Sequence, residues 1–191
     1  MQSWGAAVIG EPVDLSHWAH VLRKPFDPWV EVHGNETILR SEYLDELKSA
    51  SEVRDRALSI IDRLNGAIGL SQGARPLRFG GVAEFASNGR LHRTMFAETA
   101  YFDLRGATVS ANVTVIGPDG KTVPPSAPLP SEVQKWARVA DSDELLGDAL
   151  VYFGRSSNWF DIYKTLECLI LKFGPSEGEF LDLGGHRKTR F

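Results

Sequence analysis

The feature of this sequence that most restricts its fold is a long helical stripe of apolar residues. Residues 49 to 70 read SASEVRDRALSIIDRLNGAIGL, and Ser49 with Glu52 three positions later has the spacing of a capping box. Apolar side chains then recur at helical spacing at Val53, Ala57, Ile60, Ile61, Leu64, Ala67 and Ile68. A helix with one apolar face has to bury that face against a second layer, so the rest of the chain must provide one.

Short strand patterns surround this helix and supply that layer. Residues 29–33 and 37–40 flank HGNE, where Gly34 and Asn35 tolerate a positive φ, so a hairpin is predicted. LRFGGVAEFA and RLHRTMFAETAYFDL, between Pro76 and Val123, are joined by Asn88-Gly89, the strongest short signal for a two-residue turn. A third strand is predicted at TVSANVTVI, residues 108 to 116, because small or polar residues alternate there with apolar ones.

The Asn88-Gly89 turn predicts a register as well as a hairpin. With a two-residue loop, Glu84 faces Arg93 and Phe85 faces His92. One face of the sheet is then expected to hold Phe79, Ala83, Phe85, Phe96, Ala100 and Phe102. In the adjacent RFGG, the two glycines fit a bulge or a close backbone contact better than a phosphate site.

The second half of the chain is predicted to be helical. PPSAPLP, residues 124–130, is read as a semi-rigid connector because prolines cluster there without any charge. Capping patterns follow at Ser131 with Gln134, at Asp141 with Glu144 and at Asn158 with Asp161. The predicted fold class is therefore α+β: an antiparallel β-meander packed on one long helix, followed by a carboxyl-terminal helical segment. We divide the chain into a β-rich part (1–123), the connector and a helical segment (131–191), which can also pack on the first part as one domain.

The last predicted helix has the clearest pattern of the three. After Asn158, apolar residues fall at helical spacing at Trp159, Ile162, Tyr163, Leu166, Leu169, Ile170 and Phe173, and Gly174-Pro175 is expected to end the helix. A stripe this wide is typical of a buried packing face, so we predict a core helix. Cys168 is expected to be a small buried hydrophobe, because no cationic residue or histidine lies within three positions of it to lower its pKa. Glu167 lies at the border of the stripe and is expected to take a cationic partner from elsewhere in the structure.

Composition narrows the function classes. The 191 residues carry 21 Lys and Arg against 25 Asp and Glu, and a net charge of -4 gives no general attraction to nucleic acid or to an anionic membrane. One cysteine excludes an internal disulfide framework and fits a reducing compartment. The amino-terminal residues lack the basic start and apolar run of a signal peptide, and no run of about 20 apolar residues occurs. We therefore expect a cytoplasmic protein with no membrane partner.

Two groups of polar residues have compositions that reactive sites also have. Asp14, His17 and His20 would share a helix face and could begin a metal site, but Asp14 is also the natural N-cap of that helix, so we predict no metal. Glu84 and Arg93, with His92 beside them, resemble an acid/base group, although a cross-strand ion pair is the commoner explanation. GxSxG, P-loop, GxGxxG and CxxC patterns are absent, and no cofactor is predicted.

The densest basic run lies in the last six residues, HRKTRF. Arg187, Lys188 and Arg190 either belong to a solvated terminus or bind phosphate groups. We take these three residues and Glu167 as the candidate binding residues.

A family resemblance gives this basic run a specific meaning. NWFDIYKTLECL and the later KTRF, after a β-rich half and a Pro-containing connector, resemble a group of uncharacterised bacterial proteins whose carboxyl-terminal helices are similar to HEPN-type domains, mainly across residues 143–191. The resemblance implies a ribonuclease or a nucleotide-binding module, and more helix after the KTRF-like segment. The family places a histidine a few residues after an arginine. None of the five histidines has an arginine five to seven positions before it, so nuclease chemistry is carried over to no residue.

The function that these observations favour is a non-catalytic binding or regulatory module that contacts a protein partner or a second copy of itself. Each charged candidate has a structural explanation, and none converges with another in the sequence. The alternative is a degenerate or incomplete HEPN-like ribonuclease or RNA-binding protein that uses Arg187, Lys188 and Arg190, with Glu167 as an orienting group. A third option is a small-molecule pocket between the sheet and the long helix.

Overall fold

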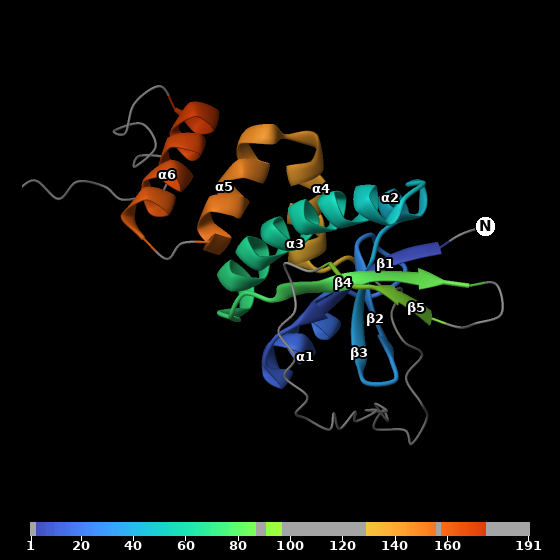
Figure 1. Ribbon diagram of the computed structural model, residues 1–191. Coiled ribbons are helices and arrows are strands. Elements are labelled where there is room, and N and C mark those ends of the chain that lie inside the picture. Colours follow the sequence, from blue (N-terminus) through green and yellow to red (C-terminus); the bar gives the residue numbers. More distant parts are fainter. Residues whose placement is uncertain (1–2, 87–90, 97–128, 156–157, 175–191) are drawn as a thin grey trace, which may run out of the picture.

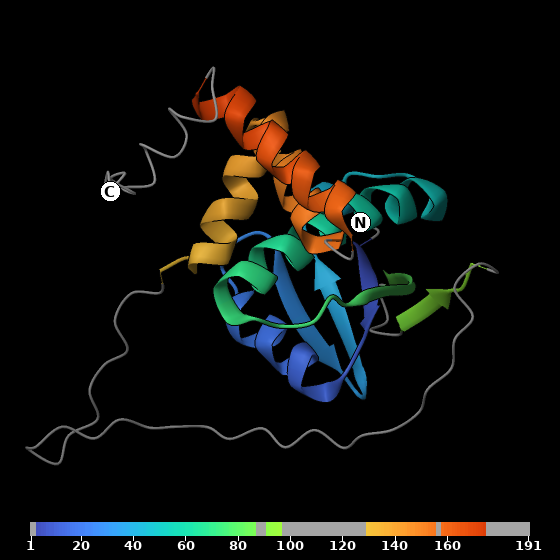
Figure 2. The ribbon, with the colours of Figure 1, turned by 90° about the vertical axis from the view of Figure 1, so that its left-hand side faces the viewer.

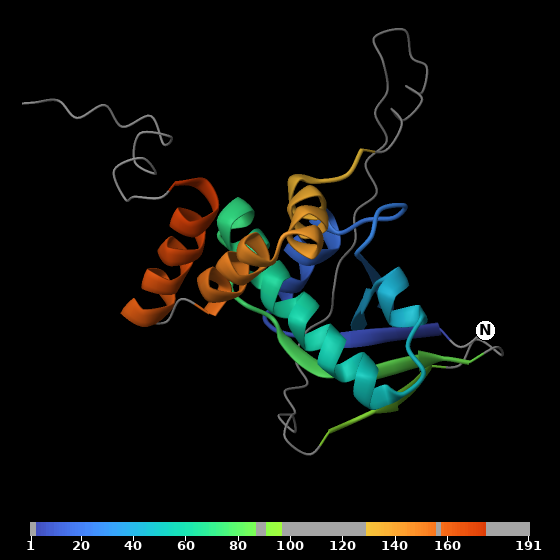
Figure 3. The same cartoon turned by 90° about the horizontal axis from the view of Figure 1, so that it is seen from above.

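A computed structural model of the protein describes residues 3–86, 91–96, 129–155 and 158–174, and it has an α+β fold. The strands β1 (Ser3–Ile9), β2 (Trp29–His33), β3 (Glu36–Arg40), β4 (Arg78–Phe85) and β5 (Leu91–Thr94) form one antiparallel sheet in the order β2-β3-β1-β4-β5. The long helix α3 (Ala50–Gln72) lies across this sheet (Figures 1 and 3). The predicted class, an antiparallel sheet with one long helix packed on it, is confirmed.

The centre of the sheet is a strand that sequence reasoning missed. β1 lies between β3 and β4, so the predicted meander is interrupted: the hairpins β2–β3 and β4–β5 are joined through the first strand of the chain. The hairpin around Gly34 is confirmed, with φ of 61° at that residue. Trp4, Ala6 and Val8 of β1 alternate along one face and are buried in the main core. This alternation was the signal that could have revealed the strand.

The register of β4 and β5 differs from the prediction by one residue. Ala83, not Glu84, lies opposite Arg93, and Phe85 lies opposite Leu91. The Arg93 guanidinium instead contacts the Glu36 carboxylate and the Gly80 carbonyl oxygen. A one-residue shift turns every side chain to the other face, and the observed register brings Leu91 to the cluster that contains Ala83. The predicted cross-strand pair of Glu84 with Arg93 is therefore wrong, both as an ion pair and as an acid/base group, because Glu84 lies opposite His92 and Arg93 is on the other face.

The predicted bulge at the glycine pair is confirmed. Ala7 pairs with Gly81 but Val8 pairs with Phe79, so Gly80 is an extra residue in β4. Gly81 has φ of 136°, a conformation that side chains other than glycine's rarely adopt. Because of the bulge, Phe79 and Phe85, which were predicted to share one face of the sheet, lie on opposite faces. Phe79 lies in the main core under α3, whereas Phe85 packs on the small cluster of the other face.

The prediction for the long helix is confirmed. The Ser49 hydroxyl accepts a hydrogen bond from the Glu52 amide at 3.3 Å, and Gly73 ends the helix in a left-handed conformation. All seven stripe residues are buried: Val53, Ala57, Ile60, Ile61, Leu64, Ala67 and Ile68. Helix α1 (Pro12–Val21) adds Trp18 to the same core, and the short helix α2 (Glu42–Asp45) adds Leu44.

One buried glutamine connects helix α4 (Glu132–Ser142) to the segment between α1 and β2. Gln134 completes the predicted capping box with Ser131, through hydrogen bonds of 3.1 Å in each direction. Its side-chain Nε2 lies 2.9 to 3.1 Å from three carbonyl oxygens, those of Arg23, Phe26 and Pro28. The glutamine thus donates to three backbone carbonyls of the segment between α1 and β2, of which that of Arg23 also accepts from the Phe26 amide.

Helix α5 (Glu144–Arg155) packs on α3 with its backbone very close to it. Its cap is Asp143, whose carboxylate accepts from the Leu146 amide at 3.2 Å, so the predicted cap at Asp141 is wrong. Asp141 is still inside α4 and instead forms a 2.7 Å ion pair with Arg63 of α3. A methyl group on Gly66 would lie 2.0 Å from the Leu150 carbonyl oxygen, and the two helices can approach this closely because Gly66 has no side chain.

Several predictions fall on residues outside the described ranges. These are the third strand at 108–116, the Asn88-Gly89 turn, most of the connector at 124–130 and the basic run with Arg187, Lys188 and Arg190. Within the described part of the chain, no helix has the length and apolar character needed to cross a membrane. The predicted boundaries at 123 and 131 stay a prediction.

Candidate functional site

The largest group of exposed apolar side chains in the described ranges lies on the last helix. Helix α6 (Trp159–Phe173) begins as predicted, with the Asn158 side chain accepting from the Asp161 amide at 3.1 Å, and Gly174 ends it. It packs mainly against α5 and lies at the edge of the molecule farthest from the sheet (Figures 1 and 2). Trp159 is 84% exposed and Tyr163 is 63% exposed.

The prediction that the α6 stripe is a buried packing face is therefore wrong. Five of its seven residues are exposed, and we call them the α6 outer face: Trp159, Ile162, Tyr163, Leu166 and Phe173. The helix packs on α5 through its opposite side, where Cys168 is buried at 8% exposure. An apolar stripe shows that a helix face avoids water, but it does not show what covers that face. Phe160 and Leu171, which are apolar but lie outside the stripe, were the signal that this helix is apolar on more than one side.

Glu167, the one candidate binding residue that the structure describes, has its partner on the same helix. Lys164 lies one turn earlier, and its Nζ is 2.6 Å from the Glu167 carboxylate. The hydrogen bond and the charge of Glu167 raise the pKa of Lys164. Glu167 therefore has a cationic partner, but this partner comes from its own helix and not from elsewhere in the structure as expected.

Cys168 has the environment of an unreactive thiol. Burial raises its pKa, and the carboxylates of Asp148 and Glu167 raise it further, which outweighs the opposite effect of the Lys164 charge. The net effect disfavours the thiolate, which is the nucleophilic form. The prediction that Cys168 is a buried hydrophobe is confirmed.

This environment can be measured directly, because Cys168 is the only cysteine of the chain. We expect the native protein at pH 8 to react with a disulfide reagent such as DTNB more slowly than the urea-unfolded chain, since a raised pKa lowers the fraction of thiolate and burial restricts access of the reagent. The native rate should increase as the pH rises toward 10. Equal rates for the folded and unfolded chains would contradict the assignment.

Of the three residues considered as a metal site, Asp14 has another partner, whereas the Nδ1 atom of His17 is buried without a hydrogen-bond partner. The Asp14 carboxylate accepts from the Arg75 amide at 3.0 Å, and the N-cap of α1 is Glu11, so the predicted capping role of Asp14 is wrong. No cluster of three His, Cys, Asp or Glu side chains suited to a metal occurs within the described ranges. Asp14 connects α1 to the chain that follows α3.

A second charged group lies on the sheet face opposite α3, around Arg40. Its guanidinium contacts Glu31, Ser3 and Asp45, and it stacks 4.3 Å from the Phe85 ring. Burial alone would raise the pKa of Glu31, but hydrogen bonds from Lys24 and Trp29 and the charge of Arg40 outweigh it and lower that pKa. Because Arg40 is buried and its charge is already paired, this group holds β1, β2 and β3 together.

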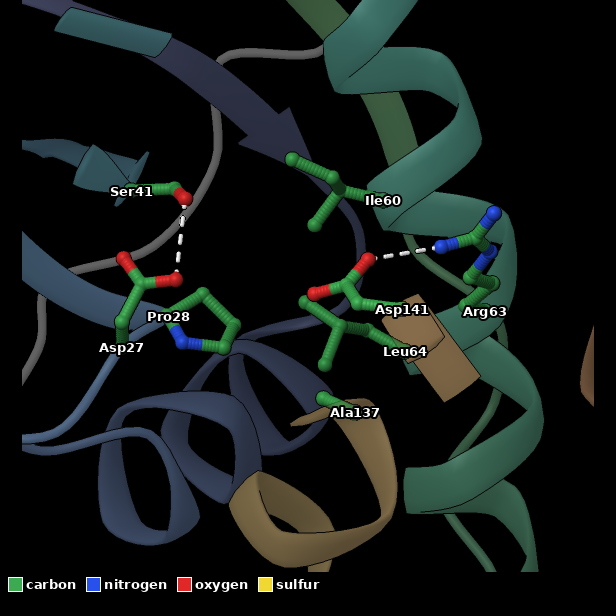
Figure 4. A pocket seen from close by; sticks show the side chains of 8 residues that line it. All are labelled: Asp27, Pro28, Ser41, Ile60, Arg63, Leu64, Ala137 and Asp141. Atoms are coloured by element: carbon green, nitrogen blue, oxygen red, sulfur yellow. Dashed lines mark hydrogen bonds and ion pairs between the residues drawn. The ribbon is translucent and has the colours of Figure 1, made fainter. Parts of the chain in front are cut away.

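A depression between the sheet end, α3 and α4 is the place closest to the small-molecule pocket considered above (Figure 4). Its accessible volume is about 10 Å³, which is about the space of one water molecule. The polar groups that line it already have partners: Asp27 accepts from the Ser41 hydroxyl at 3.1 Å and from the Glu42 amide at 2.8 Å, and Asp141 pairs with Arg63. Drug-sized ligands need several hundred Å³, so this depression does not fit such a ligand.

The sequence matches no protein-family model, and neither curated proteins nor solved structures give a match. The α6 outer face is therefore the candidate site that the structure itself provides.

Proposed function

We propose that this chain is a non-catalytic protein-binding module that contacts its partner through the α6 outer face. The observation that carries the proposal is the exposure of Trp159 and Tyr163 on a helix held by its opposite side. Exposed apolar patches rich in aromatic residues are typical of protein interfaces. The Tyr163 hydroxyl and the Trp159 indole NH can form hydrogen bonds with a partner or with water at the edge of such an interface.

The charged and polar groups of the described ranges support this proposal indirectly. Glu167, Arg40, Asp27 and Asp141 each have intramolecular partners. Catalytic groups are usually recognised as titratable residues that converge in a cleft with perturbed pKa values. Here these residues explain how the fold is held, whereas the α6 outer face has no such explanation.

A photo-crosslinking experiment tests the proposal in the cells from which the protein comes. p-Benzoylphenylalanine replaces Tyr163 in one variant and Tyr43 of α2 in the control, which is also an exposed tyrosine but lies at the opposite end of α3 (Figure 1). After irradiation we expect a covalent adduct with protein from position 163 and little or none from position 43. Equal labelling at both positions, or no adduct at 163, would overturn the proposed function.

The RNA-binding alternative rests on Arg187, Lys188 and Arg190 and predicts a different result. Binding through three cations should weaken steeply with salt, by a slope of about -2 in log K against log salt for a single strand. The same irradiated sample should then contain an adduct that ribonuclease removes. An apolar protein interface gives neither effect, because its contacts are screened little by salt.

A further inference from the structure

The side of α6 that faces α5 is its polar side. Measured from Cys168, Asp161, Lys164, Thr165 and Lys172 lie at -7, -4, -3 and +4, so they share one side of the helix. Cys168 is the one buried residue of this helix, and the other four are half-buried or exposed. The helix is therefore attached mainly through its polar side, which buries little apolar surface.

Helix α6 also lies outside the hydrophobic core of the described residues. The two clusters of buried apolar side chains contain none from α6, and the main cluster reaches the helical segment at Val133, Ala137 and Leu150 of α4 and α5. Lys172 forms an ion pair with Asp143 at the start of α5, but both side chains stay partly exposed, and such pairs contribute little to stability. Separating α6 from α5 therefore costs far less free energy than unfolding the sheet with α3.

We propose that α6 is a detachable helix, which separates from α5 and returns as one unit while the sheet, α3 and α5 stay folded. Fifteen residues form only a marginal helix in water when nothing packs on them, so the backbone hydrogen bonds of α6 open when it separates. In the separated form, Cys168 and the surface of α5 beneath it become accessible.

This opening gives the chain two forms that a ligand can distinguish. A ligand that binds the separated form better than the closed one shifts the chain toward it, so α6 acts as a conformational switch. The inference goes beyond the proposed function, because it depends on the inner side of the helix and not on the α6 outer face.

Hydrogen–deuterium exchange of the full chain, followed by mass spectrometry of its peptides, measures the opening. We expect the amides of α6 to exchange together and at least about 100-fold faster than those between Ile60 and Ile68 of α3, which open only when the whole fold does. The amides of α5 should exchange more slowly than those of α6. Exchange of α6 as slow as that of α3, or of α5 as fast as that of α6, would overturn the proposal.

Asp143→Asn tests the attachment itself. The change removes the charge that faces Lys172 and keeps the oxygen that accepts from the Leu146 amide. We expect exchange of α6 and labelling of Cys168 by DTNB to become about two- to fivefold faster, which is the effect of losing a partly exposed ion pair, while α3 is unchanged. Glu132→Gln is the matched control, because it removes the ion-pair partner of Lys135 on α4 and should change neither rate. Equal effects of the two variants on α6 would contradict the described attachment.

Ile61→Val separates local opening from unfolding of the whole chain. It removes one carbon from a side chain that is 2% exposed in the main core, so global unfolding becomes about two- to tenfold more frequent. Exchange of the α3 amides should accelerate by that factor, whereas exchange of α6 should not change, because the contacts of α6 are intact. If α3 and α6 accelerate equally, α6 opens only with the whole chain and the proposal is wrong.

Discussion

Gly66→Ala is expected to lower the free energy of unfolding by about 3 kcal/mol, the upper part of the usual cost of overpacking a close contact. The new methyl carbon would lie 2.0 Å from the Leu150 carbonyl oxygen and 2.8 Å from its carbonyl carbon. These are backbone atoms of a helix, so they cannot move aside as a flexible side chain can. Alanine raises helix propensity by up to about 1 kcal/mol, which offsets only part of the cost.

Gly69→Ala on the same helix is the control, and its expected effect has the opposite sign. The nearest atoms to that methyl carbon are at 3.8 and 3.9 Å, which is ordinary contact. The propensity gain should then stabilise the protein by about 0.5 to 1 kcal/mol. Urea unfolding of the two variants measures both effects. If Gly66→Ala is as stable as Gly69→Ala, α3 and α5 do not pack as described.

Gln134→Glu is expected to lower the free energy of unfolding by about 3 to 5 kcal/mol at pH 7, although it only replaces the side-chain NH₂ group by an oxygen. The oxygen that accepts from the Ser131 amide is kept, but the donor that faces three carbonyl oxygens is replaced by a second oxygen. A buried carboxylate would then face the negative ends of three carbonyl dipoles. Gln72→Glu, the same change at an exposed position, should stay within about 0.5 kcal/mol of the parent.

The cost of Gln134→Glu should depend on pH in a defined direction. Burial and the carbonyl dipoles favour the neutral acid, so the pKa of the new carboxyl in the folded state lies above its unfolded value of about 4.3. The contribution of a group with a raised folded pKa is fully present below the unfolded pKa and is lost as the pH rises through the folded one. Urea unfolding should therefore show a smaller difference from the parent at pH 4 than at pH 7. A difference that is the same at both pH values would contradict the described contacts of Gln134.

Helix α3 and helix α6 show what periodicity can and cannot predict. Both stripes correctly predict a helix with an apolar face. For α3, the strand patterns on both sides of it supply a covering layer, and the whole stripe is buried. For α6, nothing in the local sequence shows that the side with Cys168 would face α5 and that Trp159 would face outward. Which face is covered depends on tertiary packing, which a one-chain pattern does not contain.

The sheet was predictable where local turns determine it and not where distant strands meet. The hairpin at Gly34 and the bulge at Gly80-Gly81 follow from the conformational freedom of glycine, which is a local property. The register of β4 with β5 depends on the loop that joins them, and a loop of one more or one fewer residue changes it. The place of β1 depends on pairing with β3 and β4, 30 to 80 residues later in the chain, and no local pattern gives a strand its neighbours.

The central position of β1 has a consequence for how the chain folds during synthesis. β1 ends at residue 9, but its second neighbour is complete only at residue 85, so the ribosome adds 76 residues in between. At about 5 to 20 residues per second, this takes roughly 4 to 15 seconds. During that time Trp4 and Val8 have no finished sheet to enter, and the nascent chain exposes an apolar strand with free backbone edges. We expect the nascent chain to be most prone to aggregation during this interval.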